Sequence, residues 1–351
     1  MDILKPSMAL TVFQMLGDFP PDWDDAYQQL ANNKAGVLDS VQPDQKQLGW
    51  STGRDVLSCD FNDETCRCGD YYLLHLRAAE RKASSKLMAA AVERKVELWK
   101  KQTDSSRVPR KIRRDIQAEV ADELSHKALP TLTWIQVIVV PAERRVYALN
   151  FSSASSDTLI VQFYKTFGVE LEQLTPWGWA KALDTNVPPP DGIGREFLTW
   201  CLWQGEVWKL DGDPAFYVAD PIELYYDDEH QDEARVSTTV AAKGYGAPVC
   251  DELQAALLGG KTLSKAMLRI APNHEDLWEG RFEANRMVWS GLKLPKEEGD
   301  TDDERIGERI QAIAEMIKLV HDRFADFWRD YQKPDYSERR RAWINGRARH
   351  E

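Results

Sequence analysis

The sequence predicts an α+β protein in which helices cover antiparallel sheets, with a projecting basic αα-hairpin and a long C-terminal helix. Residues 131–174 follow a β–β–α–β order, with β-branched and aromatic residues alternating on both sides of the turn PAER, and this order favours an antiparallel sheet. Residues 86–127 carry two successive apolar repeats of helical spacing, and residues 306–327 carry a third. These patterns account for the sheets, the hairpin and the final helix.

The composition is that of a globular protein with more than one domain. The chain has 351 residues, of which 43% are hydrophobic and 29% charged, and this length suffices for two or three domains. No apolar run approaches the roughly 20 residues that span a bilayer, and the N-terminus lacks the basic start and cleavage site of a secretory signal. We therefore expect a cytoplasmic protein with no membrane partner.

The first half of the chain is predicted to be one α+β unit interrupted by the hairpin. Residues 1–76 contain a strand (ALTVFQMLGDF), a short helix (DDAYQQLANN) and a second strand (YYLLHLRA) that leads into the hairpin at residues 77–130. Residues 131–183 complete the sheet with two strands, a helix (SSDTLIVQFYKTFG) and the strand VELEQL. Ser156 or Asp157 is the expected cap of that helix, and Gly168 its end.

A linker at residues 184–194, stiffened by three consecutive prolines, precedes a second α+β domain at residues 195–296. This domain opens with the aromatic helix REFLTWCLWQGE and contains a second helix, PVCDELQAALLGG. Its other segments are expected to be strands: DPAFYVADPIELYY, ARVSTTVAAKG, KTLSKAMLRIAP and LWEGRFEANRMVWSGLKLP. The acidic run DDEHQDE (227–233) is expected to be a solvated hairpin tip rather than a metal site.

The C-terminal part opens with an acidic linker at residues 297–304, in which Thr301 and Glu304 fit a capping box. The helix predicted at residues 305–332 has apolar residues that step by four and three, as in a coiled coil: Ile306, Ile310, Ile313, Ile317, Val320, Phe324 and Phe327. This seam docks either on its own chain or on a partner. Residues 333–351 form a basic tail, expected to be disordered alone and to offer a further phosphate contact.

Positive charge is concentrated in one segment of an acidic chain. The formal net charge is −12, yet residues 77–114 contain 13 Lys or Arg and four acidic residues. This segment therefore carries +9, and the remaining residues carry −21. Net charge alone argues against a polyanionic partner, whereas this distribution argues for one.

The periodicity shows how the hairpin displays this charge. Two apolar series of helical spacing, separated by the polar break QTDSSR, predict two packed helices whose Lys and Arg side chains project outward: Leu87, Ala91, Val92, Val96 and Trp99, then Val108, Ile112, Ile116, Val120 and Leu124. Pro109 suits a first helical turn and Pro130 marks the end. No acid lies between Arg107 and Arg114, so these cations repel one another, and phosphate is the simplest partner. A solvated face or an acidic protein partner remain alternatives.

Signatures of catalysis and metal binding are weak. The sequence has no Walker A loop, GxSxG, GxGxxG or HExxH motif, and GDTDDE resembles a nuclease carboxylate pair but falls at a helix start, where acids favour the dipole. Cys59, Cys66, Cys68 and His75 have ligand chemistry suited to zinc, but their spacing matches none of the usual paired patterns. We expect reduced thiols, no metal or other cofactor, and no enzymatic activity.

The order of several runs resembles the recombination-associated protein RdgC family of bacteria and phages. The resemblance spans most of residues 8–295 and is carried by LGWS, YLLHLRAAERKASSKLMAAAVERKVELWKK, HKALP, WIQVIVVPAERRVYALNFSSASSDTLIVQFYKTFGVELEQL, REFLTWCLW, LLGGKTLSKAMLRI and GLKLP. The acidic linker, the heptad helix and the basic tail depart from it. The resemblance implies a non-catalytic DNA-binding protein that forms a ring-shaped homodimer, encircles duplex DNA in the nucleoid, and restrains a RecA-type recombinase.

The candidate DNA-binding residues come from the resemblance and from the charge pattern. The resemblance supplies Arg77, Arg81, Lys82, Lys86, Arg110, Lys111, Arg113, Arg114, Lys261 and Lys265. The charge pattern adds Arg94, Lys100, Lys101 and Arg107. Two other functions remain open: an interaction module whose hairpin docks on an acidic protein, and a metal-dependent nuclease.

Overall fold

The computed structural model describes residues 2–43, 45–150, 156–205, 215–225, 239–244, 250–271 and 277–347. The strands are β1 Met8–Leu16, β2 Lys46–Thr52, β3 Arg67–Cys68, β4 Tyr71–Glu80, β5 Thr131–Val140, β6 Arg145–Leu149, β7 Glu170–Gln173, β8 Ala215–Tyr225, β9 Thr239–Ala242, β10 Thr262–Ala271, β11 Trp278–Glu283 and β12 Val288–Lys293. The helices are α1 Trp23–Asn32, α2 Asp63–Cys66, α3 Ser85–Thr103, α4 Arg110–Lys127, α5 Ser156–Phe167, α6 Pro176–Leu183, α7 Ile193–Gly205, α8 Asp251–Leu258, α9 Asp302–Tyr331 and α10 Tyr336–Arg347. Short 3₁₀ turns occur at Asp2–Leu4, Leu38–Ser40 and Pro141–Glu143.

The α+β class is confirmed, but the described strands form one antiparallel sheet rather than two. Their order is β2-β4-β5-β6-β1-β12-β11-β10-β8-β9, with β3 on β4 and β7 on β1. The two halves join where β1 pairs with β12, with Met8 opposite Leu292 and Leu10 opposite Trp289. This joint could not be predicted from local patterns, because the paired residues are 284 and 279 positions apart in the chain.

Helices cover the sheet on both faces. In the first half, α1 and α5 pack on one face around Phe13, Trp50 and Phe163. A second core on the opposite face runs into the second half, where α7 and α9 pack on the strands through Phe197 and Phe324. Burial of side chains of this size stabilises by about 1.5–3 kcal/mol each, so both cores hold the sheet firmly.

The heptad helix docks on its own chain. All seven predicted seam residues of α9 are buried, at 5% exposure or less. Its predicted capping box is present, since Thr301 Oγ1 accepts from Glu304 N at 3.2 Å and Glu304 Oε2 accepts from Thr301 N at 3.0 Å. The acidic linker is also anchored, because Glu297 pairs with the buried Arg309 at 3.0 Å.

Three helices were not predicted: the four-residue α2 and two longer ones. The run PWGWAKAL forms α6, and the supposed tail forms α10 over Tyr336–Arg347. Trp343 of α10 stacks on Trp203 of α7 at 5.9 Å, and Tyr336 is buried. The expectation of a disordered tail is therefore wrong for this segment, while the last four residues and the acidic run 227–233 lie outside the described residues.

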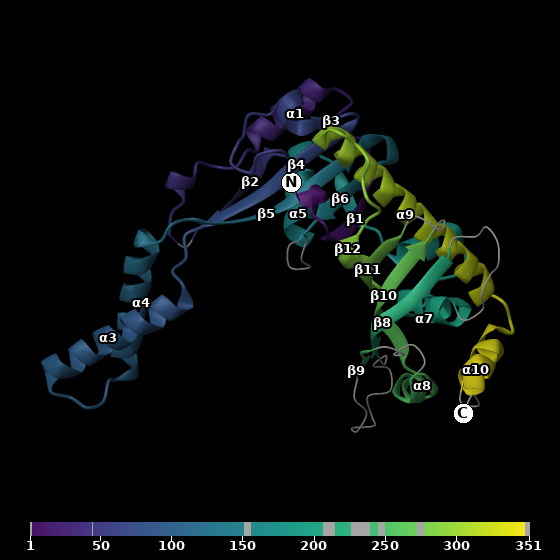
Figure 1. Ribbon diagram of the computed structural model, residues 1–351. Helices are drawn as coiled ribbons and strands as arrows, with labels where there is room; N and C mark the ends of the chain where they lie inside the picture. The colour runs from purple at the N-terminus through teal and green to yellow at the C-terminus, as the bar shows by residue number, and fades with distance from the viewer. Residues whose placement is uncertain are drawn as a thin grey trace.

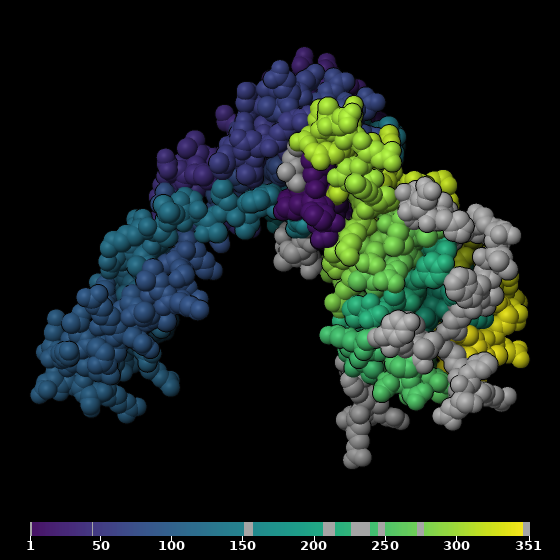
Figure 2. Space-filling view, in the orientation of Figure 1, coloured from purple at the N-terminus to yellow at the C-terminus, as the bar shows by residue number. Residues whose placement is uncertain are grey.

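The molecule has the shape of an arch (Figure 1). The α3–α4 hairpin forms one arm and projects from the ends of β4 and β5, while α9 runs along the convex side of the body, away from the hairpin. A hollow separates the hairpin from the second half of the molecule in the space-filling view (Figure 2).

Candidate nucleic-acid interface

The hairpin is a small unit with its own core. Val92 and Val96 of α3 pack against Ile116 and Val120 of α4, and all four are buried. Ser84 caps α3 by accepting from Leu87 N at 3.2 Å. The two helices are thus held together by packing within the hairpin, which leaves their outer faces free for contact with a partner.

Some hairpin cations hold the hairpin together. Lys95 of α3 reaches across to Glu119 and Glu123 of α4, at 3.0 and 3.1 Å, and hydrogen bonds to these carboxylates raise the pKa of Lys95. Lys100 pairs with Glu97 at 2.8 Å. Lys100, a predicted DNA contact, therefore already has a carboxylate partner within the hairpin.

Nine predicted cations are exposed and form no ion pair or side-chain hydrogen bond within the described part of the chain. Six lie at the tip of the hairpin and three nearer its base. We call them the free hairpin cations: Lys101, Arg107, Arg110, Lys111, Arg113 and Arg114 at the tip, and Lys82, Lys86 and Arg94 toward the base.

The first turns of α4 intensify the positive potential of the tip. This helix has no acidic residue in its first turn, and its N-cap, Pro109, provides no side-chain hydrogen bond. The helix N-terminus therefore presents unpaired N–H groups and the positive end of the dipole among Arg110, Lys111, Arg113 and Arg114. An anion at this position would meet both the cations and the helix end.

Two predicted contacts at the hairpin base are structural. Arg77 is only 3% exposed and donates to Gly36 O at 2.5 Å and to Val56 O at 3.2 Å. Arg81 is half-buried and donates to Ala128 O at 3.1 Å. The structure does not favour Arg77 as a DNA contact, because its buried guanidinium is already bonded to two backbone carbonyls. Arg81 chiefly ties the end of β4 to the end of α4.

The two predicted contacts in the second half are also corrected. Lys261 is 6% exposed and therefore buried in the folded chain. Lys265 lies on β10 and pairs with Glu283 of β11 at 3.4 Å. Neither residue belongs to the hairpin surface, and burial removes Lys261 from any DNA-contacting face.

The open face of the second-half sheet carries charge of both signs. Glu279 accepts from Arg269 at 2.7 Å and from Lys293 at 3.1 Å, and these bonds lower the pKa of Glu279. Glu223 pairs with Arg281. Most of the positive charge on this face is therefore compensated, in contrast to the hairpin tip.

Two arginines of α10 form ion pairs with carboxylates of the body. Arg339 pairs with Asp330 at 2.9 Å and Asp335 at 3.0 Å, and Arg340 pairs with Glu196 at 2.7 Å. These bonds fasten α10 to α9 and α7. The expected phosphate contact of this segment is not supported for these two arginines.

The residues considered as metal ligands or nuclease carboxylates form hydrogen bonds or ion pairs with other groups of the chain. His75 Nδ1 bonds Thr52 O at 2.6 Å, and Cys68 Sγ donates to Asp303 O at 3.4 Å. Asp303 pairs with Arg54 at 2.7 Å, and Asp302 pairs with Arg305. Among the described residues, no group of three or more His, Cys, Asp or Glu side chains is arranged to hold a metal ion.

Comparison with known proteins gives no family assignment: no protein-family model matches the chain, and no curated protein shows significant similarity to it. Within the described ranges, no helix is both long and apolar enough to cross a membrane.

Proposed function

We propose that this protein is a non-catalytic DNA-binding protein that contacts phosphates and reads little or no sequence. The observation that carries the proposal is the set of free hairpin cations, displayed on an arm that stands clear of the body (Figure 1). Lys and Arg side chains that neutralise phosphates release condensed counterions, and this release drives binding. Phosphate contacts position a protein without distinguishing bases.

A ring-shaped homodimer that encircles duplex DNA is the second part of the proposal. It is supported by the arch and its hollow (Figure 2), and by the resemblance of the sequence to the RdgC family. Occupation of DNA in the nucleoid would restrain a RecA-type recombinase by competition for the same substrate.

The binding proposal is tested by neutralising four of the tip cations. Replacing Arg110, Lys111, Arg113 and Arg114 together with Ala should weaken binding to every duplex sequence alike. It should also reduce the slope of log affinity against log salt by about 3.6, since each duplex phosphate contact contributes about 0.9. Fluorescence anisotropy of labelled duplexes over a salt series measures both quantities.

A matched control removes four cations that already have carboxylate partners. Arg144, Arg305, Lys318 and Arg329 are such residues, lie outside the hairpin, and are all more than a third exposed. Their replacement with Ala changes the net charge equally and should leave the slope nearly unchanged. Equal losses in the two variants would show that general charge, rather than the hairpin, attracts DNA.

The two alternative functions give different outcomes in the same samples. A hairpin that docks on an acidic protein leaves random duplex unbound at moderate salt. A nuclease cleaves labelled DNA when Mg²⁺ or Mn²⁺ is added. Either result would replace the proposal.

A further inference from the structure

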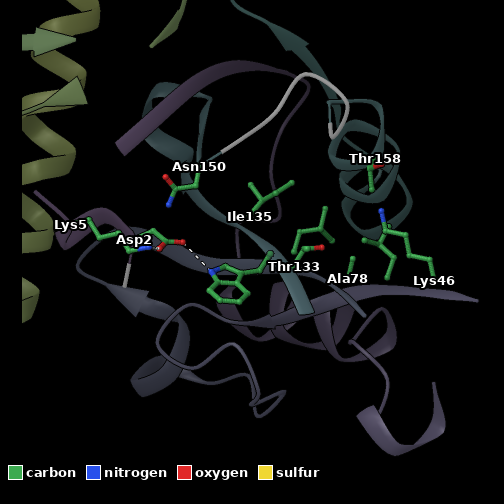
Figure 3. Close-up of a pocket in the computed structure, with 11 residues that line it drawn as sticks. Asp2, Lys5, Lys46, Ala78, Thr133, Ile135, Asn150 and Thr158 are labelled. Carbon is green, nitrogen blue, oxygen red and sulfur yellow. Dashed lines mark hydrogen bonds and ion pairs between the residues drawn. The ribbon is translucent and has the colours of Figure 1, made fainter. Parts of the chain in front are cut away.

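A cavity of about 510 Å³ lies at the base of the hairpin, next to the first residues of β5 (Figure 3). Apolar side chains line one part of it: Leu48, Leu76 and Ile135. Polar side chains line the rest, including Lys46, Thr133, Asn150 and Thr158. A largely apolar hollow with a few convergent polar groups is the usual form of a small-ligand site.

Trp134 contributes an aromatic ring to the cavity wall. Its side chain is 41% exposed, although Trp is a residue that is normally buried. Its indole N–H donates to Asp2 Oδ2 at 3.1 Å, which fixes the orientation of the ring. The ring has no aromatic or cationic partner in the described part of the chain. Trp134 therefore presents a partly exposed aromatic ring whose orientation is fixed by a hydrogen bond.

Asp2 is a firm anchor for this ring. Its side chain is 5% exposed and pairs with Lys5 at 2.5 Å. Burial acts to raise the pKa of Asp2, but hydrogen bonds from Lys5, Asn150 and Trp134 outweigh it and hold the pKa below its usual value. The carboxylate is thus ionised at neutral pH and available as an acceptor for the indole N–H.

The strand that carries Trp134 has, among the described residues, no second partner strand at the cavity. β5 pairs with β4 from Thr131 to Val139, but with β6 only from Gln136 to Val140. Along residues 131–135, the described chain therefore supplies a strand partner on one side only. Alternate residues there direct backbone N–H and C=O groups outward, where a planar polar ligand can form hydrogen bonds.

The position of the cavity connects it with the hairpin. α4 ends at Lys127 and β5 begins at Thr131, so the cavity lies where the cationic arm joins the body. Lys46 on its rim is exposed and has no ion pair among the described residues. Lys46 shares a face of the sheet with Leu48 and Ile135, whereas Trp134 lies on the other face. A strand that follows the hairpin cations toward the body therefore meets the ring of Trp134 at the edge of β5 without contacting Lys46.

We propose that this cavity takes an unstacked nucleobase, from single-stranded DNA or a frayed duplex end, with the base on the ring of Trp134 at the edge of β5. The inference rests on the proposed DNA binding and adds a preference to it. A base paired within an intact duplex cannot enter the cavity, so this contact is specific to unpaired strands. Base–aromatic stacking contributes about 1–3 kcal/mol per base and tolerates any sequence.

The test compares a 20-nucleotide single strand with the duplex of the same sequence. Trp134→Ala should weaken binding to the single strand about tenfold, the equivalent of about 1.4 kcal/mol, and change duplex affinity less than twofold. Trp134→Phe should keep most of the affinity because it retains an aromatic face. Since loss of the bond to Asp2 can disturb the fold, thermal melting of both variants is measured alongside.

A direct measurement uses single strands that contain 5-bromouracil, which crosslink on irradiation to an aromatic ring stacked on the base. A crosslink mapped to Trp134 by mass spectrometry supports the proposal. Crosslinks confined to the hairpin, or unchanged single-strand affinity in Trp134→Ala, would overturn it and leave the edge of β5 to an extended peptide. If the wild-type protein binds neither form of DNA, the proposed function itself fails; if binding depends on the hairpin but not on Trp134, only the nucleobase site fails.

Discussion

At the scale of single residues, position divides the basic side chains into two roles. Arg309 of α9 is buried, pairs with Glu297, and donates to Ile3 O and Lys5 O at 2.7 and 2.6 Å. Its guanidinium therefore joins α9 to the first residues of the chain. Arg110 and its neighbours at the hairpin tip have no such partners within the described ranges. Partners and exposure, rather than charge alone, decide which cations can meet phosphate.

Asp330 offers a residue-scale prediction of pH dependence. Burial raises its pKa, but hydrogen bonds from Arg339, Lys333 and Trp200 outweigh burial and lower the pKa to about 2. A carboxyl group with a lowered folded pKa stabilises above its unfolded pKa, and this contribution disappears as pH falls through the folded pKa. Asp330→Asn should therefore cost about 1–2 kcal/mol at pH 7, and less at pH 3.

Urea unfolding of the wild type and the variant at both pH values measures this difference. Asp326→Asn is the control, because Asp326 is 48% exposed and pairs with the more exposed Arg329. It should change stability by less than about 0.5 kcal/mol. A penalty for Asp330→Asn that is the same at pH 3 as at pH 7 would show that packing, not the charge, makes the contribution.

At the scale of elements, α4 begins with cations at positions where acidic residues would stabilise the helix better. Cations near a helix N-terminus oppose the dipole, whereas acids there favour it. Arg110→Glu with Lys111→Glu should therefore stabilise α4 by about 0.3–1 kcal/mol per substitution, while weakening DNA binding. Hydrogen exchange of the α4 amides measures the first effect, and anisotropy the second.

The control for this pair is Gln117→Glu, an exposed position two turns into the same helix. It adds negative charge away from the helix end and should alter the exchange rates little. Faster exchange in the Arg110→Glu, Lys111→Glu variant would mean that these cations support the fold, and would weaken their assignment as phosphate contacts.

The elements also show what sequence reasoning can reach. The two hairpin helices and α9 were predicted because each of the three helices has its own uninterrupted apolar repeat, and all the seam residues of α9 are buried. α6 was missed because Pro176 and Gly178 look like a turn, although Pro suits the first helical turn. α10 was missed because only a few apolar residues, such as Tyr336 and Ile344, attach it to the body.

Sequence reasoning likewise identified only the part of the candidate site that depends on local periodicity. Exposure of the hairpin tip follows from local periodicity, so its cations could be identified from the sequence. Arg77 could not be excluded, because its acceptors, Gly36 and Val56, are 41 and 21 residues away in the chain. Trp134 was likewise hidden, since an exposed Trp in a strand has the same sequence pattern as a buried one. Long-range contacts decide such cases, and one chain's sequence does not contain them explicitly.

At the scale of the whole molecule, the arch is held as one unit. The sheet is continuous through the pairing of β1 with β12. α9 spans the joint, with Asp303 at one end paired to Arg54 of the first half and Phe324 packed against Phe197 of the second. The two halves of the sheet are thus fixed relative to one another by the fold rather than by a loose linker.

This fixed arch leads to a prediction about assembly. One chain contributes one cationic hairpin, whereas the open sheet face of the other half is largely charge-paired. A second copy related by a two-fold axis would add another cationic hairpin and could close the hollow, since two-fold dimers are the commonest assemblies. Sedimentation velocity should therefore give twice the chain mass of 40.2 kDa, with and without duplex DNA. The four-alanine hairpin variant should keep this mass if its cations serve DNA alone, whereas a wild-type protein that binds DNA as a monomer at every concentration would rule out the ring.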